Sequence, residues 1–74
     1  MMNINIYGST GIIGTKSLNI IYNYFPKIKI NLLCANNNVK KLAKQSYIYC
    51  PKYIYLNNND KIDYLNKIKN PKTK

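Results

Sequence analysis

Residues 4–14 read Ile4-Asn5-Ile6-Tyr7-Gly8-Ser9-Thr10-Gly11-Ile12-Ile13-Gly14, and this stretch decides the fold of the 74-residue chain. An alternating apolar run ends at Gly8, two more glycines follow at three-residue intervals, and a helical pattern begins at Ile13. This order predicts a strand, a tight turn and the first turn of a helix. Such a turn between a first strand and a first helix is typical of sites that bind the diphosphate of a nucleotide.

The three glycines suit the backbone geometry of such a site. Gly8 allows a sharp turn off the strand, where a β-carbon would obstruct or φ must be positive, and Gly11 lets the backbone approach the phosphates. Gly14 permits close packing of the helix on the strand. The N–H groups of the first helical turn have no intrahelical partner and attract anions. The hydroxyls of Ser9 and Thr10 can cap the helix or reach a phosphate oxygen.

A second interpretation of the same residues is a glycine-rich turn that binds nothing. The spacing Gly-x-x-Gly-x-x-Gly differs by one residue from the commoner Gly-x-Gly-x-x-Gly pattern. The position of the turn, between the first strand and the first helix of the chain, favours nucleotide binding.

The chain beyond Gly14 alternates between helical and strand patterns. Leu18, Ile21 and Phe25 form one apolar helical stripe that ends before Pro26, and we expect this stripe to face a sheet. A strand over 28–35 becomes continuously apolar, which predicts a parallel strand covered on both faces. Asn36, Asn37 and Asn38 then form a turn, with Asn38 as the N-cap of the next helix.

That second helix must end before Pro51, and a third strand follows over 53–56. We expect the buried face of the second helix to comprise Val39, Leu42, Ala43 and Tyr47. Residues 57–59 form another turn, and Asp60 and Asp63 lie at the positive end of a third helix. The core face of this helix comprises Ile62, Leu65 and Ile68.

These elements predict an α/β fold of the form βαβαβα. Right-handed crossovers then give a three-stranded parallel sheet in the order 3-2-1, which is half of a Rossmann-type doubly wound domain. We assign residues 1–70 to this half-domain and residues 71–74 to a lysine-rich tail. In a complete sheet the first strand would be central, so here we expect it to have one unpaired edge.

The net charge is +10, from 12 lysines and two aspartates, with no arginine or histidine. One interpretation is nucleic-acid binding; the other is the coding bias of an A+T-rich genome, which also explains the abundance of Asn, Ile and Tyr. The lysines are scattered along all segments, so we favour coding bias and expect no nucleic-acid partner. No apolar run is long enough to span a membrane and no signal peptide begins the chain, so we expect a cytoplasmic protein. Cys34 and Cys50 form no metal-ligand set, and we expect two reduced packing residues.

The sequence resembles a known family, 1-deoxy-D-xylulose 5-phosphate reductoisomerase. The resemblance covers about residues 4–65 and rests on the segments 8–15, 33–39 and 51–53, together with Leu18, Leu42 and Gln45. It implies a cofactor, NADPH, bound by the turn and by the residues after the second strand. The cofactor-binding residues are then Gly8, Ser9, Thr10, Gly11, Ile12, Ile13, Gly14, Asn36, Asn37 and Asn38. Ile12 stands where the family usually has serine, and Asn36 often corresponds to glycine, which asparagine can imitate at positive φ.

The resemblance also implies an oxidoreductase that makes 2-C-methyl-D-erythritol 4-phosphate for isoprenoid synthesis. A complete family member would be a homodimer, with a phosphorylated sugar as substrate and a divalent metal, Mg or Mn. The metal-binding carboxylates and the substrate site lie downstream of the cofactor part. We therefore expect no catalytic residue, no metal site and no activity in these 74 residues alone. Such a chain could come from a truncated gene, a gene remnant or a split enzyme.

Two other functions fit the sequence less well. One is a small basic module that binds nucleotides or nucleic acid, and the other is a fragment of an unrelated NAD- or NADP-dependent oxidoreductase. The residues themselves favour NADPH over NADH, because the end of the second strand carries asparagines where an NAD site typically has a carboxylate. Lys40 and Lys41 follow directly and could add positive charge near a 2′-phosphate.

Overall fold

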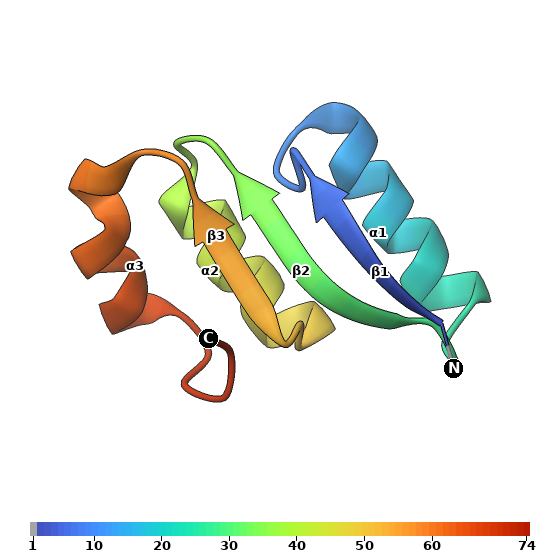
Figure 1. The fold of residues 1–74 in the computed structure, drawn as a ribbon. Helices are drawn as coiled ribbons and strands as arrows, with labels where there is room; N and C mark the ends of the chain where they lie inside the picture. The colour runs from blue at the N-terminus through green and yellow to red at the C-terminus, as the bar shows by residue number, and fades with distance from the viewer. Residues whose placement is uncertain (1) are drawn as a thin grey trace.

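The computed structural model describes residues 2–74, which form a three-stranded parallel sheet with helices packed on one face (Figure 1). The strands are β1 (Asn3–Tyr7), β2 (Lys29–Ala35) and β3 (Tyr53–Leu56), in the spatial order β1-β2-β3. The helices are α1 (Ile12–Tyr24), α2 (Val39–Tyr49) and α3 (Ile62–Ile68), and a 3-10 turn, η1 (Asn59–Lys61), precedes α3. The predicted α/β fold and strand order are confirmed.

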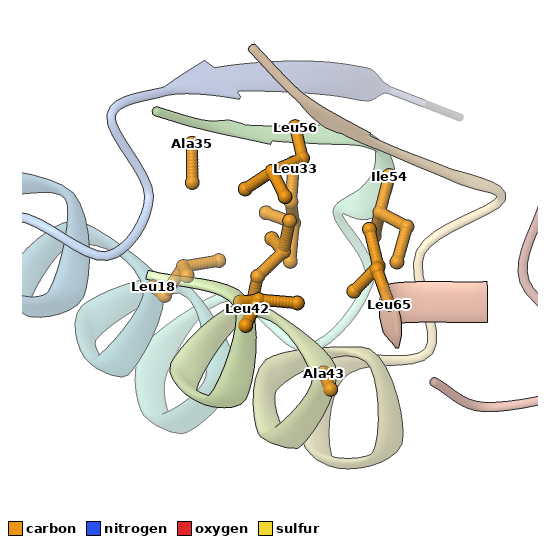
Figure 2. Close-up of a cluster of buried hydrophobic side chains, with 9 residues drawn as sticks. Leu18, Leu33, Ala35, Leu42, Ala43, Ile54, Leu56 and Leu65 are labelled. Atoms are coloured by element: carbon orange, nitrogen blue, oxygen red, sulfur yellow. The ribbon is translucent and has the colours of Figure 1, made fainter. Parts of the chain in front are cut away.

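The core lies between the sheet and the helices. Figure 2 shows side chains from β2 and β3 pointing toward α1 and α2, with Leu65 of α3 beside Ile54. Leu18, Leu33 and Leu42 are fully buried in this layer. The cluster comprises Leu18, Leu33, Ala35, Val39, Leu42, Ala43, Ile54, Leu56 and Leu65.

The opposite face of the sheet is open, so the expectation that β2 is covered on both faces is wrong within these residues. Leu33 and Ala35 are buried, but Leu32 and Cys34 on the other face are only half-buried. Cys34 pairs with Tyr7 on one side and with Tyr55 on the other. Tyr7 is 71% exposed and Tyr55 50% exposed, because every helix packs on the other face.

Two helical faces differ from the predicted ones. Phe25 lies beyond the end of α1 and is exposed. Of the predicted apolar stripe, only Leu18 is fully buried in the core. Tyr47 is exposed, whereas Gln45 and Ser46 are buried on α2. Apolar periodicity predicts that the tyrosine, and not the serine, faces the core. However, α3 and the turn after β1 pack against the polar side of α2, so Gln45 and Ser46 are buried.

Asparagine side chains cap two of the helical elements. The Asn38 side chain accepts a hydrogen bond from the Lys41 amide at 3.2 Å, so the predicted N-cap of α2 is confirmed. Asn58 caps η1 in the same way, at 3.0 Å from the Asp60 amide. Among residues 2–74 the only non-glycine residue at positive φ is Cys50, at the C-cap of α2. Asn36 therefore does not use the left-handed conformation expected of it.

The last residues pack back onto the domain. Thr73 is 1% exposed, and its hydroxyl donates to the Pro51 carbonyl at 2.8 Å. The amide of Lys74 donates to the Lys52 carbonyl at 3.0 Å. Residues 71–74, assigned from the sequence to a lysine-rich tail, thus contact the loop that leads into β3. Within residues 2–74, the helices are too short or too polar to cross a membrane.

The central position of Leu42 leads to a first prediction. Replacing Leu42 with alanine should lower the free energy of unfolding by about 2–5 kcal/mol, because a fully buried side chain leaves a cavity. Ile48→Ala is the matched control, since Ile48 lies on the same helix and is 48% exposed. Urea unfolding followed by circular dichroism measures both. Equal losses of stability in the two variants would contradict the burial of Leu42 in the core.

Candidate functional site

The predicted site residues gather where the strands end. In a parallel sheet all carboxyl ends lie at the same edge, and β1, β2 and β3 are followed there by Gly8, Asn36 and Asn57 (Figure 1). The amides of Gly8 and Ser9 both donate to the Cys34 carbonyl, at 2.8 and 3.0 Å. This pair of bonds ties the glycine turn to the end of β2, two residues before Asn36. Ligands of open α/β sheets bind at this edge.

Gly8 and Gly14 have the backbone geometry that the spacing predicts. Gly8 has φ +72°, a conformation that costs a residue with a β-carbon about 1–2 kcal/mol. A β-carbon on Gly14 would lie 2.8 Å from the Ser9 Cα atom and closer still to the Gly8 carbonyl oxygen. The start of α1 therefore rests directly on the peptide that follows β1. On Gly11, which is exposed, a β-carbon would lie 3.3 Å from the Gly8 carbonyl oxygen.

Several backbone donors of this turn have no partner among residues 2–74. The Gly11 amide donates to the Gly8 carbonyl at 3.0 Å. Within residues 2–74, the amides of Thr10, Ile12, Ile13 and Gly14 donate to no protein group. Four free amides around a helix N-terminus form a local concentration of positive partial charge. This arrangement suits a phosphate group.

The side chains of the turn contribute less than its backbone. Ser9 is fully buried, and its hydroxyl neither caps α1 nor meets another polar group among residues 2–74. Ile12 and Ile13 are 78% and 80% exposed, so apolar side chains frame the amides. An open hollow of about 440 Å³ lies beside them and is lined by Tyr7, Gly8 and Ile13 among others.

The asparagine turn after β2 is braced by the asparagine turn after β3. The Asn57 amide group donates to the Asn36 side-chain oxygen at 2.5 Å, and the Asn58 amide group donates to that of Asn37 at 2.9 Å. Backbone bonds from Asn57 to Ala35 and from Asn58 to Asn36 run parallel to them. The side-chain NH₂ groups of Asn36 and Asn37 thus stay available as donors, because their oxygens are already used.

The charge around this turn is positive. Lys61 places its Nζ atom 3.4 Å from the Asn37 carbonyl oxygen. Lys40 and Lys41 lie in the first turn of α2, after its N-cap Asn38 and its first residue Val39. The two carboxylates of the chain, Asp60 in η1 and Asp63 in the first turn of α3, follow Asn58 and Asn59. The end of β2 therefore presents amide donors and ammonium groups, a suitable setting for an anionic ligand.

Other hollows lie away from these residues. One of about 530 Å³ is at the amino end of β2, beside Tyr22, Phe25 and Tyr49. It is at the opposite end of the sheet from the glycine turn, where ligands of this fold class do not bind. Cys34 and Cys50 are free thiols. Among residues 2–74, nowhere do three or more His, Cys, Asp or Glu side chains come together as metal ligands would.

Two residues of this site are missed by the motif. Thr15 and Gln45 both donate from their side chains to the Ser9 carbonyl, at 3.3 and 2.8 Å. The first lies on α1 and the second on α2, 36 residues beyond Ser9. Among the local patterns of the sequence nothing singles out Gln45, which only the family resemblance includes, because a polar residue on a helix carries no signal that it will be buried.

The parallel sheet, the glycine turn and the position of that turn at the carboxyl edge define a Rossmann-type α/β protein. The family model described as 1-deoxy-D-xylulose 5-phosphate reductoisomerase matches residues 4–74. The chain belongs to this family.

Proteins of similar sequence are also 1-deoxy-D-xylulose 5-phosphate reductoisomerases. A reductoisomerase from Thermoanaerobacter sp. (strain X514) is 40% identical over 65 residues, which cover 88% of this chain and 17% of that protein. One from Porphyromonas gingivalis (strain ATCC 33277) is 44% identical over 59 residues, covering 80% and 15%. This chain therefore spans about a sixth of the length of these relatives.

Solved structures agree with the sequence matches. The reductoisomerase from Zymomonas mobilis in complex with NADPH superposes with a TM-score of 0.86 at 25% identity, over 90% of this chain and 18% of that one. A second reductoisomerase structure, with NADPH, fosmidomycin and magnesium, gives a TM-score of 0.83 at 27% identity, over 90% and 16%. The three-stranded half-domain is thus a part of the fold of this family.

The contact between Gly14 and the Gly8 peptide leads to a second prediction. In an open helix, Gly→Ala would stabilise by about 1 kcal/mol. At Gly14 the added β-carbon collides with backbone, so Gly14→Ala should instead destabilise the chain by about 1–3 kcal/mol. Lys16→Ala, at an exposed position of the same helix, should change stability by less than about 0.5 kcal/mol. A thermal melt of Gly14→Ala at or above that of the parent chain would refute the close contact.

Proposed function

We propose that residues 8–14 and 36–38 bind NADPH. The observation that carries this proposal is the set of unpartnered amides of Thr10, Ile12, Ile13 and Gly14 at the start of α1. A diphosphate would accept hydrogen bonds from them, with Gly8 and Gly11 giving it access to the backbone. The solved relatives that contain NADPH support the choice of ligand.

The asparagine turn is proposed to receive the adenosine end of the cofactor. The NH₂ groups of Asn36 and Asn37 and the ammonium of Lys61 are donors suited to a 2′-phosphate. Lys40 or Lys41 would add to the attraction. The absence of a carboxylate at the end of β2 supports NADPH over NADH, because a carboxylate there would repel the 2′-phosphate.

The chain is then the cofactor-binding part of a reductoisomerase. The complete enzyme would convert its phosphorylated sugar substrate to 2-C-methyl-D-erythritol 4-phosphate, and bound NADPH would supply the hydride. The residues of this chain bind and orient the cofactor. They do not fit the magnesium of the solved relative, since residues 2–74 gather no three metal-ligating side chains. We therefore assign no catalytic step to them.

Three further features of the complete enzyme stay predictions from the resemblance. They are a homodimer, a phosphorylated sugar as substrate and a cytoplasmic location.

A titration with NADPH tests the proposed binding. The parent chain should bind NADPH, and Gly11→Val should weaken binding at least about tenfold, because a valine side chain would occupy the approach to the amides. Ile20→Val is the control, since Ile20 lies on the exposed face of α1. Fluorescence of the reduced nicotinamide follows the titration. Unchanged affinity in Gly11→Val would remove the turn from the site.

The preference between cofactors gives another prediction. The parent chain should bind NADPH more tightly than NADH, and Asn36→Asp should reduce or reverse this preference by placing a carboxylate at the end of β2. Asn66→Asp makes the same charge change at an exposed position on α3 and should leave the preference unaltered. Both cofactors are compared at low and at physiological salt. Equal affinity, or tighter binding of NADH by the parent chain, would contradict the assignment.

A further inference from the structure

Gln45 makes an unusual contact for a polar side chain on a helix. It is 5% exposed, and its amide nitrogen donates to the Ser9 carbonyl at 2.8 Å. Its side-chain oxygen has no partner among residues 2–74. Burying a carboxamide with one unpaired group costs free energy. Burial of this residue is therefore explained by what its nitrogen does for the turn and not by its contribution to the core.

The carbonyl that Gln45 holds belongs to the peptide between Ser9 and Thr10. A second donor, the Thr15 hydroxyl on α1, reaches the same oxygen at 3.3 Å. Two helices thus hold one carbonyl in the protein interior. In a trans peptide the C=O and N–H bonds point in opposite directions. Fixing the Ser9 carbonyl inward therefore fixes the Thr10 N–H outward.

The Thr10 amide is one of the four unpartnered donors of the glycine turn. The segment next to it is intrinsically mobile in φ and ψ, because glycines stand at positions 8 and 11. Without an anchor, the peptide between Ser9 and Thr10 could rotate and turn its carbonyl oxygen toward an incoming phosphate. An oxygen in that place would repel the anion.

We propose that Gln45 is a positioning residue of the nucleotide site, which acts by holding the Ser9–Thr10 peptide with its N–H group toward the phosphates. The proposal rests on the proposed function of the turn. Gln45 itself contacts no ligand in this arrangement. It links α2 to the turn after β1 and so preorganises the unpartnered amides of the turn for the cofactor.

Ser46 offers a matched comparison on the same helix. It is fully buried like Gln45, but its hydroxyl accepts from the Asn70 amide at 2.9 Å, near the end of the chain. Ser46→Ala and Gln45→Met each remove a buried polar contact of α2. Only Gln45→Met removes a contact with the glycine turn.

The test measures two properties of each variant. The first is NADPH affinity by fluorescence titration, and the second is the residual dipolar coupling of the Thr10 N–H bond in the ligand-free chain. Gln45→Met should weaken NADPH binding about tenfold and change the Thr10 coupling. Ser46→Ala should lose stability but keep both the affinity and the coupling of the parent. Thr15→Val removes the longer of the two bonds and should shift both properties in the same sense by a smaller amount.

The outcomes separate this proposal from the one on which it rests. Parental affinity and parental Thr10 coupling in a folded Gln45→Met variant would overturn the positioning role, as would equal weakening in Ser46→Ala. If Gln45→Met does not fold, Thr15→Val decides by the same criteria. If the parent chain does not bind NADPH, the proposed function fails, and the Thr10 coupling alone decides whether Gln45 holds the peptide.

Discussion

The close approach of α1 to the peptide after β1 is the contact on which the rest of the structure depends. It exists because Gly8 adopts positive φ and Gly14 has no β-carbon to collide with the Gly8 carbonyl. Because the helix lies close to this peptide, Leu18 is buried in the core cluster with side chains of β2. The first amides of α1 have no protein partner among residues 2–74. One packing constraint therefore serves both the stability of the half-domain and the geometry of the proposed site.

The remaining elements reinforce this corner of the molecule. The turn is tied to β2 through the Cys34 carbonyl and to α2 through Gln45. The asparagine turn after β2 is in turn braced by Asn57 and Asn58 after β3. Each strand end thus supports its neighbour, so the polar edge of the sheet is a connected network. In contrast, the open face presents Tyr7, Tyr53 and Tyr55 without any covering element among residues 2–74.

Much of the fold and of the position of the proposed site was predictable from local sequence patterns. Alternation over residues 4–7, the three glycines and the asparagine N-cap of α2 each reflect a short-range physical rule, and the structure confirms the strand, the turn and the cap they predict. The order of three strands followed from two right-handed crossovers, which need no knowledge of distant contacts. The carboxyl edge as the place of the proposed site followed from the same topology.

The sequence by itself determined the α/β fold and the turn, because these depend on residues within a few positions of one another, and it determined the strand order through the handedness of the crossovers. Only the tertiary structure decided that Gln45 and Ser46 are buried while Tyr47 is exposed, because the turn after β1 contacts Gln45 and the segment after α3 contacts Ser46. The bare face of β2 was decided in the same way, because an apolar strand is the same sequence whether one face or two are covered. Asn36 does not adopt positive φ, and its side-chain oxygen accepts a hydrogen bond from Asn57, which lies 21 residues further along the chain in the turn after β3. Only the tertiary structure brings these two turns together.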